Sequence, residues 1–302
     1  MIVVFGSINL DLIFALPAIP RPGETVLGPG VQVEPGGKGA NQAVAAARDG
    51  ARTVMIGAVG RDAFADDALT MARAAGIDLA GIARVDATTA CAAIAVDPQG
   101  RNAIAVGSGA NLSARAAQID DGLLTPDTTL LLQMELSPDE TAAAIRRAKG
   151  RVGRIVLNLA PAGSSPRDAL EAVDILVVNE HEADWLAASL GCAPDADAMR
   201  RALGVDIVRT LGGDGVEAAT GEGTIRLPAH PIAPVDTTAA GDCFVGVMAA
   251  ALDRGAGMRA ALERANRAAA LCCLRAGSQG SLPTTAEIDA WIPPTPALRQ
   301  RS

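Results

Sequence analysis

The sequence has few aromatic residues and no excess of positive charge. Its 302 residues include no tyrosine, four phenylalanines and two tryptophans, although 49% of the residues are hydrophobic. Alanine and valine must therefore build much of the core. The formal net charge is −8 and the isoelectric point is about 4.9. This balance argues against a nucleic-acid partner, which would select a basic surface. It still allows an anionic ligand, because such a ligand needs only local donors.

Paired cysteines and long apolar runs are also missing. The five cysteines form no C-x-x-C pair, and their odd number and irregular spacing predict free thiols in a reducing, cytoplasmic compartment. No uninterrupted apolar run reaches about 18 residues, so no membrane span is expected. The N-terminal "MIVVFGSINLDLIF" lacks a basic region and carries Asn9 and Asp11. It therefore predicts a strand and not a signal peptide.

Short β-branched runs alternate with segments of helical periodicity. Strands are predicted at 2–6, 52–60, 129–133, 154–159, 174–179 and 206–212, and helices at 40–50, 65–76, 137–150 and 179–191. This alternation is typical of a largely parallel sheet with helices on both faces. Ser137 and Glu140 have the spacing of a capping box at the start of one helix.

Two segments interrupt the alternation. Residues 12–35 are rich in proline and glycine, and residues 88–106 have the pattern of a hairpin that turns at "DPQG". Both predict antiparallel strands, which could form a small separate sheet over one edge of the core. The predicted domains are thus an α/β core of 1–11, 36–87 and 107–302, and a discontinuous small sheet of 12–35 and 88–106.

The stretch "VDTTAAGDCFVGVMAAAL" (235–252) places small residues before an apolar helix. Free amides at a helix N-terminus, together with the helix dipole, bind anions. The small residues at 239–241 would let a phosphate approach these amides closely. Asp242, in the first turn, could accept a proton from an alcohol, or it could simply cap the helix.

Two polar motifs could bind a sugar. Asn9 and Asp11 lie two residues apart, so in an extended segment they share one side and could bind neighbouring hydroxyls. A turn-forming pair is the alternative. "GGKGAN" (36–41) is not a Walker loop, because Gly39 follows Lys38 where that loop has Ser or Thr. Its glycines allow close backbone approach, and Lys38 and Asn41 offer donors, although a plain glycine-rich loop is possible.

Other motifs follow later strands. The acids of "VVNEHE" could organise Mg²⁺ through water, or could belong to a solvated helix N-terminus. "TLGGDG" (210–215) could cover a nucleotide or be only a hairpin turn. "GAGMRA" (255–260) fits a dinucleotide fingerprint but follows a helix, so it is set aside. Together the motifs follow four or five strands at one expected sheet edge, which favours a site for an anionic nucleotide and a polyhydroxyl partner.

The order of "GSINLD", "GGKGANQAVAAAR", "VVNEHE", "TLGGDG" and "DTTAAGDCF" resembles the ribokinase-like sugar kinases of the PfkB family over nearly the whole chain. The resemblance implies a three-layer α/β/α core with a mainly parallel sheet and a β-sheet lid, often shared across a homodimer. It implies transfer of phosphate from ATP to the terminal hydroxyl of a pentose, with D-ribose as the first candidate. The partner would be a small-molecule sugar, with no nucleic acid and no membrane.

The resemblance also implies roles for residues on the sugar side. Asn9 and Asp11 would bind sugar hydroxyls, and the loop closing over the sugar would comprise Gly37, Lys38, Gly39, Ala40 and Asn41. Glu135 would be the nearby acid, although "QMELSP" is one residue longer before the proline than the family's usual form. Asp242 would be the general base, and the anion hole would consist of the amides of Ala239, Ala240, Gly241 and Asp242.

Nucleotide and cation sites are implied in the same way. Asn179 and Glu182 would serve the Mg²⁺-nucleotide, and Asn266 would border the adenine. The nucleotide would be lined by Gly241 and by Thr210, Leu211, Gly212, Gly213, Asp214 and Gly215, with Asp214 standing where the family often has a cationic or neutral residue. The K⁺ site would lie at Asp236 and Thr238, with main-chain oxygens of Cys272, Arg275, Gly277 and Ser281. Cys243 stands where threonine is common and is interpreted as a packing residue.

Three alternatives remain. The first is a kinase of another sugar or of a nucleoside such as adenosine on the same fold; a nucleoside kinase would stack its nucleobase on aromatic residues, but only Phe14 lies in a lid segment. A non-catalytic sugar sensor would be expected to lose the base or the anion hole, and both motifs are present. A dinucleotide oxidoreductase lacks its fingerprint in the proper context.

Overall fold

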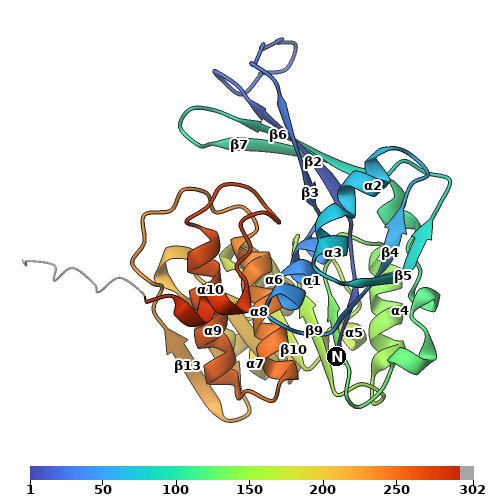
Figure 1. Ribbon diagram of the computed structural model, residues 1–302. Coiled ribbons are helices and arrows are strands. Elements are labelled where there is room, and N and C mark those ends of the chain that lie inside the picture. The colour runs from blue at the N-terminus through green and yellow to red at the C-terminus, as the bar shows by residue number, and fades with distance from the viewer. Residues whose placement is uncertain (293–302) are drawn as a thin grey trace, which may run out of the picture.

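A nine-stranded sheet forms the middle layer of the protein, seen in a computed structural model that describes residues 1–292 (Figure 1). Residues 293–302, the end of the predicted core, lie outside the described residues. The strand order is β13-β12-β11-β10-β9-β8-β1-β4-β5, parallel from β11 to β5 and antiparallel at β12 and β13. The strands are β1 (Ile2–Phe5), β4 (Thr53–Val59), β5 (Asp78–Arg84), β8 (Thr129–Leu132), β9 (Arg154–Asn158), β10 (Ile175–Val178), β11 (Asp206–Thr210), β12 (Val216–Thr220) and β13 (Gly223–Leu227).

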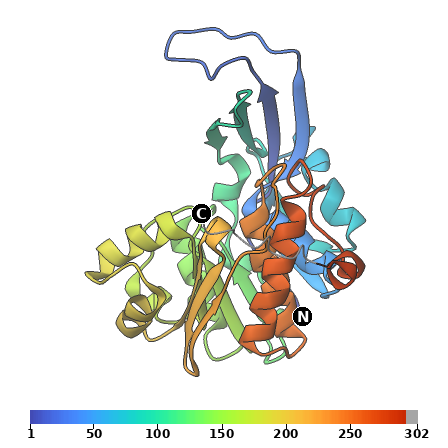
Figure 2. The same cartoon turned by 90° about the vertical axis from the view of Figure 1, so that its left-hand side faces the viewer.

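Helices cover both faces of this sheet, as Figure 2 shows. Side chains of β1 alternate between the faces: Ile2 and Val4 join one core cluster, and Val3 and Phe5 join the other. One face carries α1 (Lys38–Arg48), α2 (Phe64–Ala68), α3 (Thr70–Ala74), α8 (Ala240–Asp253), α9 (Met258–Cys272) and α10 (Thr285–Ala290). The other carries α4 (Pro138–Ala148), α5 (Arg167–Leu170), α6 (Glu180–Leu190) and α7 (Ala196–Leu203). The predicted three-layer architecture is confirmed.

Two local predictions are wrong. The helix predicted over 65–76 is two short helices, because α2 ends before Leu69 and α3 begins after it. The capping box at the start of α4 does not form. Ser137 is the N-cap but its side chain accepts no capping hydrogen bond, and Glu140 Oε2 instead accepts the N–H of Ala116 at 2.7 Å. The carboxylate of Glu140 thus bonds to a neighbouring 3₁₀ segment, Ala116–Gln118, and does not cap α4.

A small four-stranded sheet projects from the three layers (Figures 1 and 2). Its order is β3-β2-β6-β7, with β2 (Asn9–Ala15), β3 (Val31–Gly36), β6 (Ala90–Val96) and β7 (Asn102–Gly107). Both hairpins are antiparallel, and the second turns at 97–100 as predicted. The sheet as a whole is mixed, however, because β2 and β6 leave the core in the same direction and pair in parallel. The division into core and lid domains at the stated residues stays a prediction.

The structure also bears on the expected lack of a membrane span, on the "GAGMRA" motif and on the cysteines. Within residues 1–292, no helix combines the length and the apolar character needed to cross a membrane. The "GAGMRA" segment runs from the end of α8 into α9, so no strand precedes it and the dinucleotide motif lacks its structural context. All five cysteines are free thiols.

Candidate active site

The N-terminus of α8 has an unusual backbone. Its N-cap, Ala239, has φ 57°, the only positive φ at a non-glycine residue in the described chain. Alanine rarely adopts this left-handed conformation, and such strain concentrates at functional sites. No side chain caps the helix, so its first amides have no side-chain partner there. Asp242 is therefore not a helix cap, and the simpler interpretation of that residue is wrong.

Asp242 is buried and held by two amides of α1. Asp242 is only 7% exposed. Asn41 Nδ2 donates to Asp242 Oδ2 at 2.9 Å, and Gln42 Nε2 donates to Asp242 Oδ1 at 2.9 Å. The loop "GGKGAN" and the helix of "DTTAAGD" thus meet at this carboxylate. Each oxygen of Asp242 keeps further lone-pair capacity for another hydrogen bond.

Lys38 begins α1, and Glu135, from the segment between β8 and α4, bonds to it. Glu135 Oε2 accepts the backbone N–H of Lys38 at 3.0 Å and the hydroxyl of Ser7 at 2.6 Å. Gly37, with φ 90°, must be a glycine, because a Cβ there would collide with the backbone of Ser7–Asn9. The pKa of Lys38 is raised above its ordinary value, first by the charge of Asp242 and then by those of Glu135 and Glu182, against the opposing effect of burial. One ammonium group therefore stands among three carboxylates.

Asn9 and Asp11 lie on β2, so the turn interpretation of this pair is wrong. Both are buried, and Asn9 Oδ1 accepts a hydrogen bond from Asn111 Nδ2 at 2.8 Å. The pKa of Asp11 is raised to about 7, mainly by burial and then by the charges of Glu135, Glu34 and Asp242. The predicted sugar-side residues therefore gather at one acidic site.

Asn179 and Glu182 form a capping box at the start of α6. Glu182 Oε2 accepts the N–H of Asn179 at 2.8 Å, and Asn179 Oδ1 accepts the N–H of Glu182 at 2.9 Å. Glu182 is buried, which raises its pKa, while the Asn179 N–H and Lys38 act to lower it. The interpretation as a solvated helix N-terminus is therefore wrong for Glu182. Within residues 1–292, no cluster of three or more His, Cys, Asp or Glu side chains is arranged to hold a metal directly.

The segment 210–215 is the turn of the β11–β12 hairpin. The N–H of Leu211 donates to Gly215 O at 2.8 Å, and residues 212–214 form a 3₁₀ turn. Gly212, Gly213 and Gly241 face open space, because a Cβ on any of them would meet no atom within 4 Å. Thr210 Oγ1 donates to Val178 O at 3.5 Å, and Asn266 Nδ2 donates to Pro228 O at 2.8 Å. The open glycines would admit a ligand along this edge.

Most residues of the predicted cation site lie together. Asp236 Oδ1 accepts the N–H and the hydroxyl of Thr238 at 2.9 and 2.7 Å, and Asp236 Oδ2 accepts the N–H of Gly277 at 3.0 Å. Burial acts to raise the pKa of Asp236, but these hydrogen bonds hold it below its ordinary value. Cys272 Sγ lies 3.0 Å from Ser281 Oγ. The side chain of Arg275 instead pairs with Glu287, so only its main chain could contribute.

Comparison with known proteins identifies the family. The model of the pfkB family carbohydrate kinases matches residues 1–285. The chain is a member of the PfkB family of carbohydrate kinases. A ribokinase of Bacillus subtilis is 38% identical over 95% of this chain and 98% of its own. The structure of a ribokinase from Thermotoga maritima superposes with a TM-score of 0.88 at 32% identity, covering 96% of this chain and 98% of that one.

A third relative is a ribokinase from Arabidopsis thaliana whose structure contains ribose and ATP. It has a TM-score of 0.83 at 27% identity and covers 95% of this chain and 96% of that one. These relatives and the family match make the present chain a kinase that transfers a phosphoryl group to a sugar hydroxyl.

Several residues of this kinase's site were missed by the sequence analysis. Gln133, Asn158 and Gln42 are buried amides linked to one another, and Ser7 joins Glu135 to the glycine loop. Glu34 on β3 accepts the N–H of Ser278 at 2.9 Å and so joins the small sheet to the loop beside Asp236. Gln133 and Asn158 do carry a sequence signal, since each is a polar residue at the end of a predicted buried strand.

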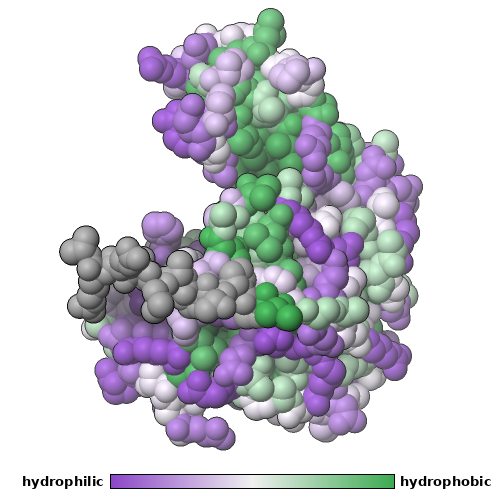
Figure 3. Space-filling model, turned by 60° about the vertical axis from the view of Figure 1, so that its left-hand side comes forward, coloured by the Kyte–Doolittle hydropathy of each residue, from purple (hydrophilic) through white to green (hydrophobic). Residues whose placement is uncertain are grey.

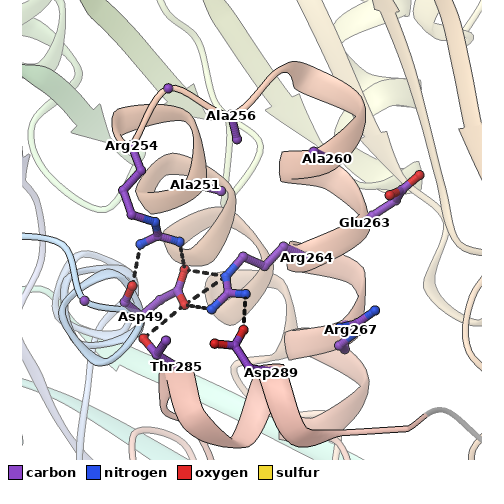
Figure 4. Close-up of a pocket in the computed structure, with 12 residues that line it drawn as sticks. Asp49, Ala251, Arg254, Ala256, Ala260, Glu263, Arg264, Arg267, Thr285 and Asp289 are labelled. Atoms are coloured by element: carbon purple, nitrogen blue, oxygen red, sulfur yellow. Dashed lines mark hydrogen bonds and ion pairs between the residues drawn. The ribbon is translucent and has the colours of Figure 1, made fainter.

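Two hollows differ in their relation to the kinase site. Figure 3 shows a recess between the projecting small sheet and the three layers, with hydrophobic residues gathered on the small sheet above it. A separate hollow of about 740 Å³ lies at the far ends of α1 and α8, where Asp49, Arg254 and Arg264 meet (Figure 4). None of the predicted site residues lines that second hollow.

Proposed function

We propose that the kinase transfers the γ-phosphoryl group of Mg²⁺-ATP to the terminal hydroxyl of D-ribose. The observation that carries the proposal is the position of Asp242: it is buried in the first turn of an uncapped helix, and both its oxygens are fixed by amides. The ribokinase relatives, one with ribose and ATP bound, support the choice of substrates.

The chemistry assigned to this chain is positioning and charge stabilisation. Asp242 takes the proton of the sugar hydroxyl as that oxygen attacks. The amides of Ala239, Ala240, Gly241 and Asp242 bind the oxygens of the transferring group, with Lys38 nearby as a cation. Loss of one such interaction typically raises a barrier by about 3 kcal/mol.

The sugar-side residues favour a small polyol over a nucleoside. Asn9, Asp11, Asn41 and Glu135 supply amide and carboxylate groups, which suit closely spaced hydroxyls. Phe14 is the single aromatic residue on the four strands of the small sheet, so a nucleobase would find little to stack on. Adenosine is therefore the weaker candidate.

The cofactor residues fit to different degrees. Open space over Gly212, Gly213 and Gly241 suits a nucleotide that reaches toward Asn266. Asn179 and Glu182 suit Mg²⁺ held through water, since Mg²⁺ keeps much of its hydration and each of the two side chains already accepts the backbone N–H of the other residue. Carbonyl oxygens near Asp236, Thr238 and Gly277 suit K⁺, which would neutralise charge beside the anion hole.

The lid would also join two copies of the chain in a homodimer. Cross-strand pairing aligns Ile13, Ile94 and Ile104, and it aligns Asp11, Ala92 and Val106 beside them. Direct neighbours across strands share a face, so the apolar row continues the face that carries Asp11. Ile104 and Val106 are 56% and 51% exposed. A second copy of the same face would cover them.

The deciding assay is ADP release at saturating Mg²⁺-ATP with pentoses including 2-deoxyribose, hexoses and adenosine, with and without K⁺. Strong turnover that depends on D-ribose and increases with K⁺ is the expected result. Turnover with a different alcohol would change the proposed substrate but leave the proposed role of Asp242 as the base unchanged. Absence of turnover with every acceptor would favour a sugar sensor.

A further inference from the structure

A chain of buried amide side chains connects the edge of the large sheet to Asp242. Asn158, at the end of β9, donates through Nδ2 to Val177 O on β10 at 3.2 Å. Its Oδ1 accepts from Gln42 Nε2 at 3.0 Å. Gln42 Nε2 also donates to Asp242 Oδ1, while Gln42 Oε1 accepts from Gln133 Nε2 at 2.6 Å. Gln42 and Gln133 are both fully buried, so water does not compete for these bonds.

The direction of this chain is fixed at the sheet. Val177 O can only accept a hydrogen bond, so Asn158 must turn its nitrogen toward Val177 and its oxygen toward Gln42. Gln42 must then present its nitrogen to Asn158, and its second N–H points at Asp242. A flipped Gln42 would bring three acceptor oxygens together with no proton between them. The backbone carbonyl of Val177 therefore orients the carboxylate of Asp242 through two intervening side chains, those of Asn158 and Gln42.

We infer that Gln42 is a positioning residue, which holds the carboxylate of Asp242 in the orientation needed to accept the sugar proton. The inference rests on the proposed role of Asp242. Asn41 holds the other oxygen and is itself fixed by Gln279 Nε2 at 3.0 Å. With both oxygens bonded, the carboxylate cannot turn about its own bond without breaking a buried hydrogen bond.

The location of Gln42 argues against a purely packing role. The residues that follow it on α1, Ala43 to Ala46, are buried and join the apolar core. An apolar residue at 42 would fill the same space without three buried polar partners. The charged groups that act on one another around this site, besides Asp242, are Asp11, Glu34, Lys38, Glu135 and Glu182, and none of these five is in the hydrogen-bond network of Gln42.

The test compares Gln42→Leu and Gln42→Glu with a matched control, Gln118→Leu. Gln118 is a half-buried glutamine whose amide nitrogen donates to the backbone carbonyls of Gly57 and Gly81, and it has no hydrogen bond to a residue of the site. We expect kcat of Gln42→Leu to fall about 100-fold, the effect of a misplaced group, with little change in KM for D-ribose. In Gln42→Glu two adjoining carboxylates would share a proton, so the acid limb of kcat should move to higher pH.

The inference is overturned if both Gln42 variants keep the kcat and pH profile of Gln118→Leu. It is also overturned if their kcat falls only in proportion to a loss of folded protein, followed by circular dichroism.

Asp242→Asn and the double variant Gln42→Leu/Asp242→Asn separate this inference from the proposed function. If Gln42 acts through Asp242, the double variant should be no slower than Asp242→Asn alone. A further loss of activity in the double variant would refute the positioning role. An active Asp242→Asn would instead refute the proposed base, and with it the basis of this inference.

Discussion

The buried ion pairs of Asp49 join α1 and α8, the two helices that carry the candidate site, and replacing this residue tests their contribution to stability. Asp49 is only 1% exposed. Its carboxylate accepts hydrogen bonds from Arg254 Nη2 at 2.7 Å, from Arg264 Nη2 at 2.5 Å and from Arg264 Nε at 3.0 Å (Figure 4). α1 ends immediately before Asp49, and α8 ends immediately before Arg254. The cluster thus ties together the far ends of the two helices whose N-termini form the candidate site.

Replacing Asp49 by Asn keeps the size of the side chain and removes its charge. Breaking a buried ion pair typically costs about 3–5 kcal/mol. The side chains of Arg254 and Arg264 are 40% and 20% exposed, so both can regain some hydration. We therefore expect the low end, about 3 kcal/mol, which corresponds to a fall in Tm of roughly 6 °C for a large domain.

Asp66→Asn is the matched control. Asp66 also pairs with two arginines, Arg73 at 2.9 Å and Arg84 at 2.5 Å, but its side chain is 65% exposed. Exposed ion pairs contribute little to stability, so its Tm should stay near that of the wild type. Thermal unfolding followed by circular dichroism at pH 7 measures both variants. Equal shifts for Asp49→Asn and Asp66→Asn would refute the argument from burial.

Two further predictions concern the sugar side and the lid. Because the pKa of Asp11 is raised to about 7, its carboxyl is largely protonated in the sugar-free protein at lower pH. D-ribose affinity measured by calorimetry should therefore rise as pH increases through about 7, and Asp11→Asn should remove this rise; the same slope in the variant would assign it to another group. Ile104→Asp should convert the proposed homodimer to a monomer in size-exclusion light scattering, whereas Val33→Asp, on the opposite face and 48% exposed, should not. The reverse pattern would place the dimer on the other face of the lid.

Much of the fold follows from short-range patterns in the sequence. Each predicted strand of the large sheet contains a short apolar run that tolerates burial on both faces, as β1 does. Motifs placed directly after such strands, including Asn9 and Asn179, therefore fall at one edge by topology alone. The hairpin at 97–100 was predictable because its turn residues lie next to one another in the chain.

The missed features depend on contacts between distant residues. Gln42 meets Asn158 across 116 positions and Asp242 across 200 positions, so no local pattern reveals these partners. Glu140 was expected to cap its own helix, but its carboxylate instead accepts the N–H of Ala116, which lies 24 positions away in the sequence. The parallel pairing of β2 with β6 likewise depends on where both strands leave the core.

The shortage of aromatic residues is connected to this geometry. α1 and α8 approach so closely that a Cβ on Gly246 would overlap the backbone of Gln42 and lie 2.7 Å from the side chain of Ala45. Buried alanines continue the contact on both helices, at 43, 45 and 46 and at 249–251. Large side chains in this interface would separate the helices and move the amides of Asn41 and Gln42 away from Asp242, since tightly packed cores absorb added volume by shifting the backbone. An alanine-rich core is therefore the condition under which two amides of one helix can reach both oxygens of a carboxylate on the other.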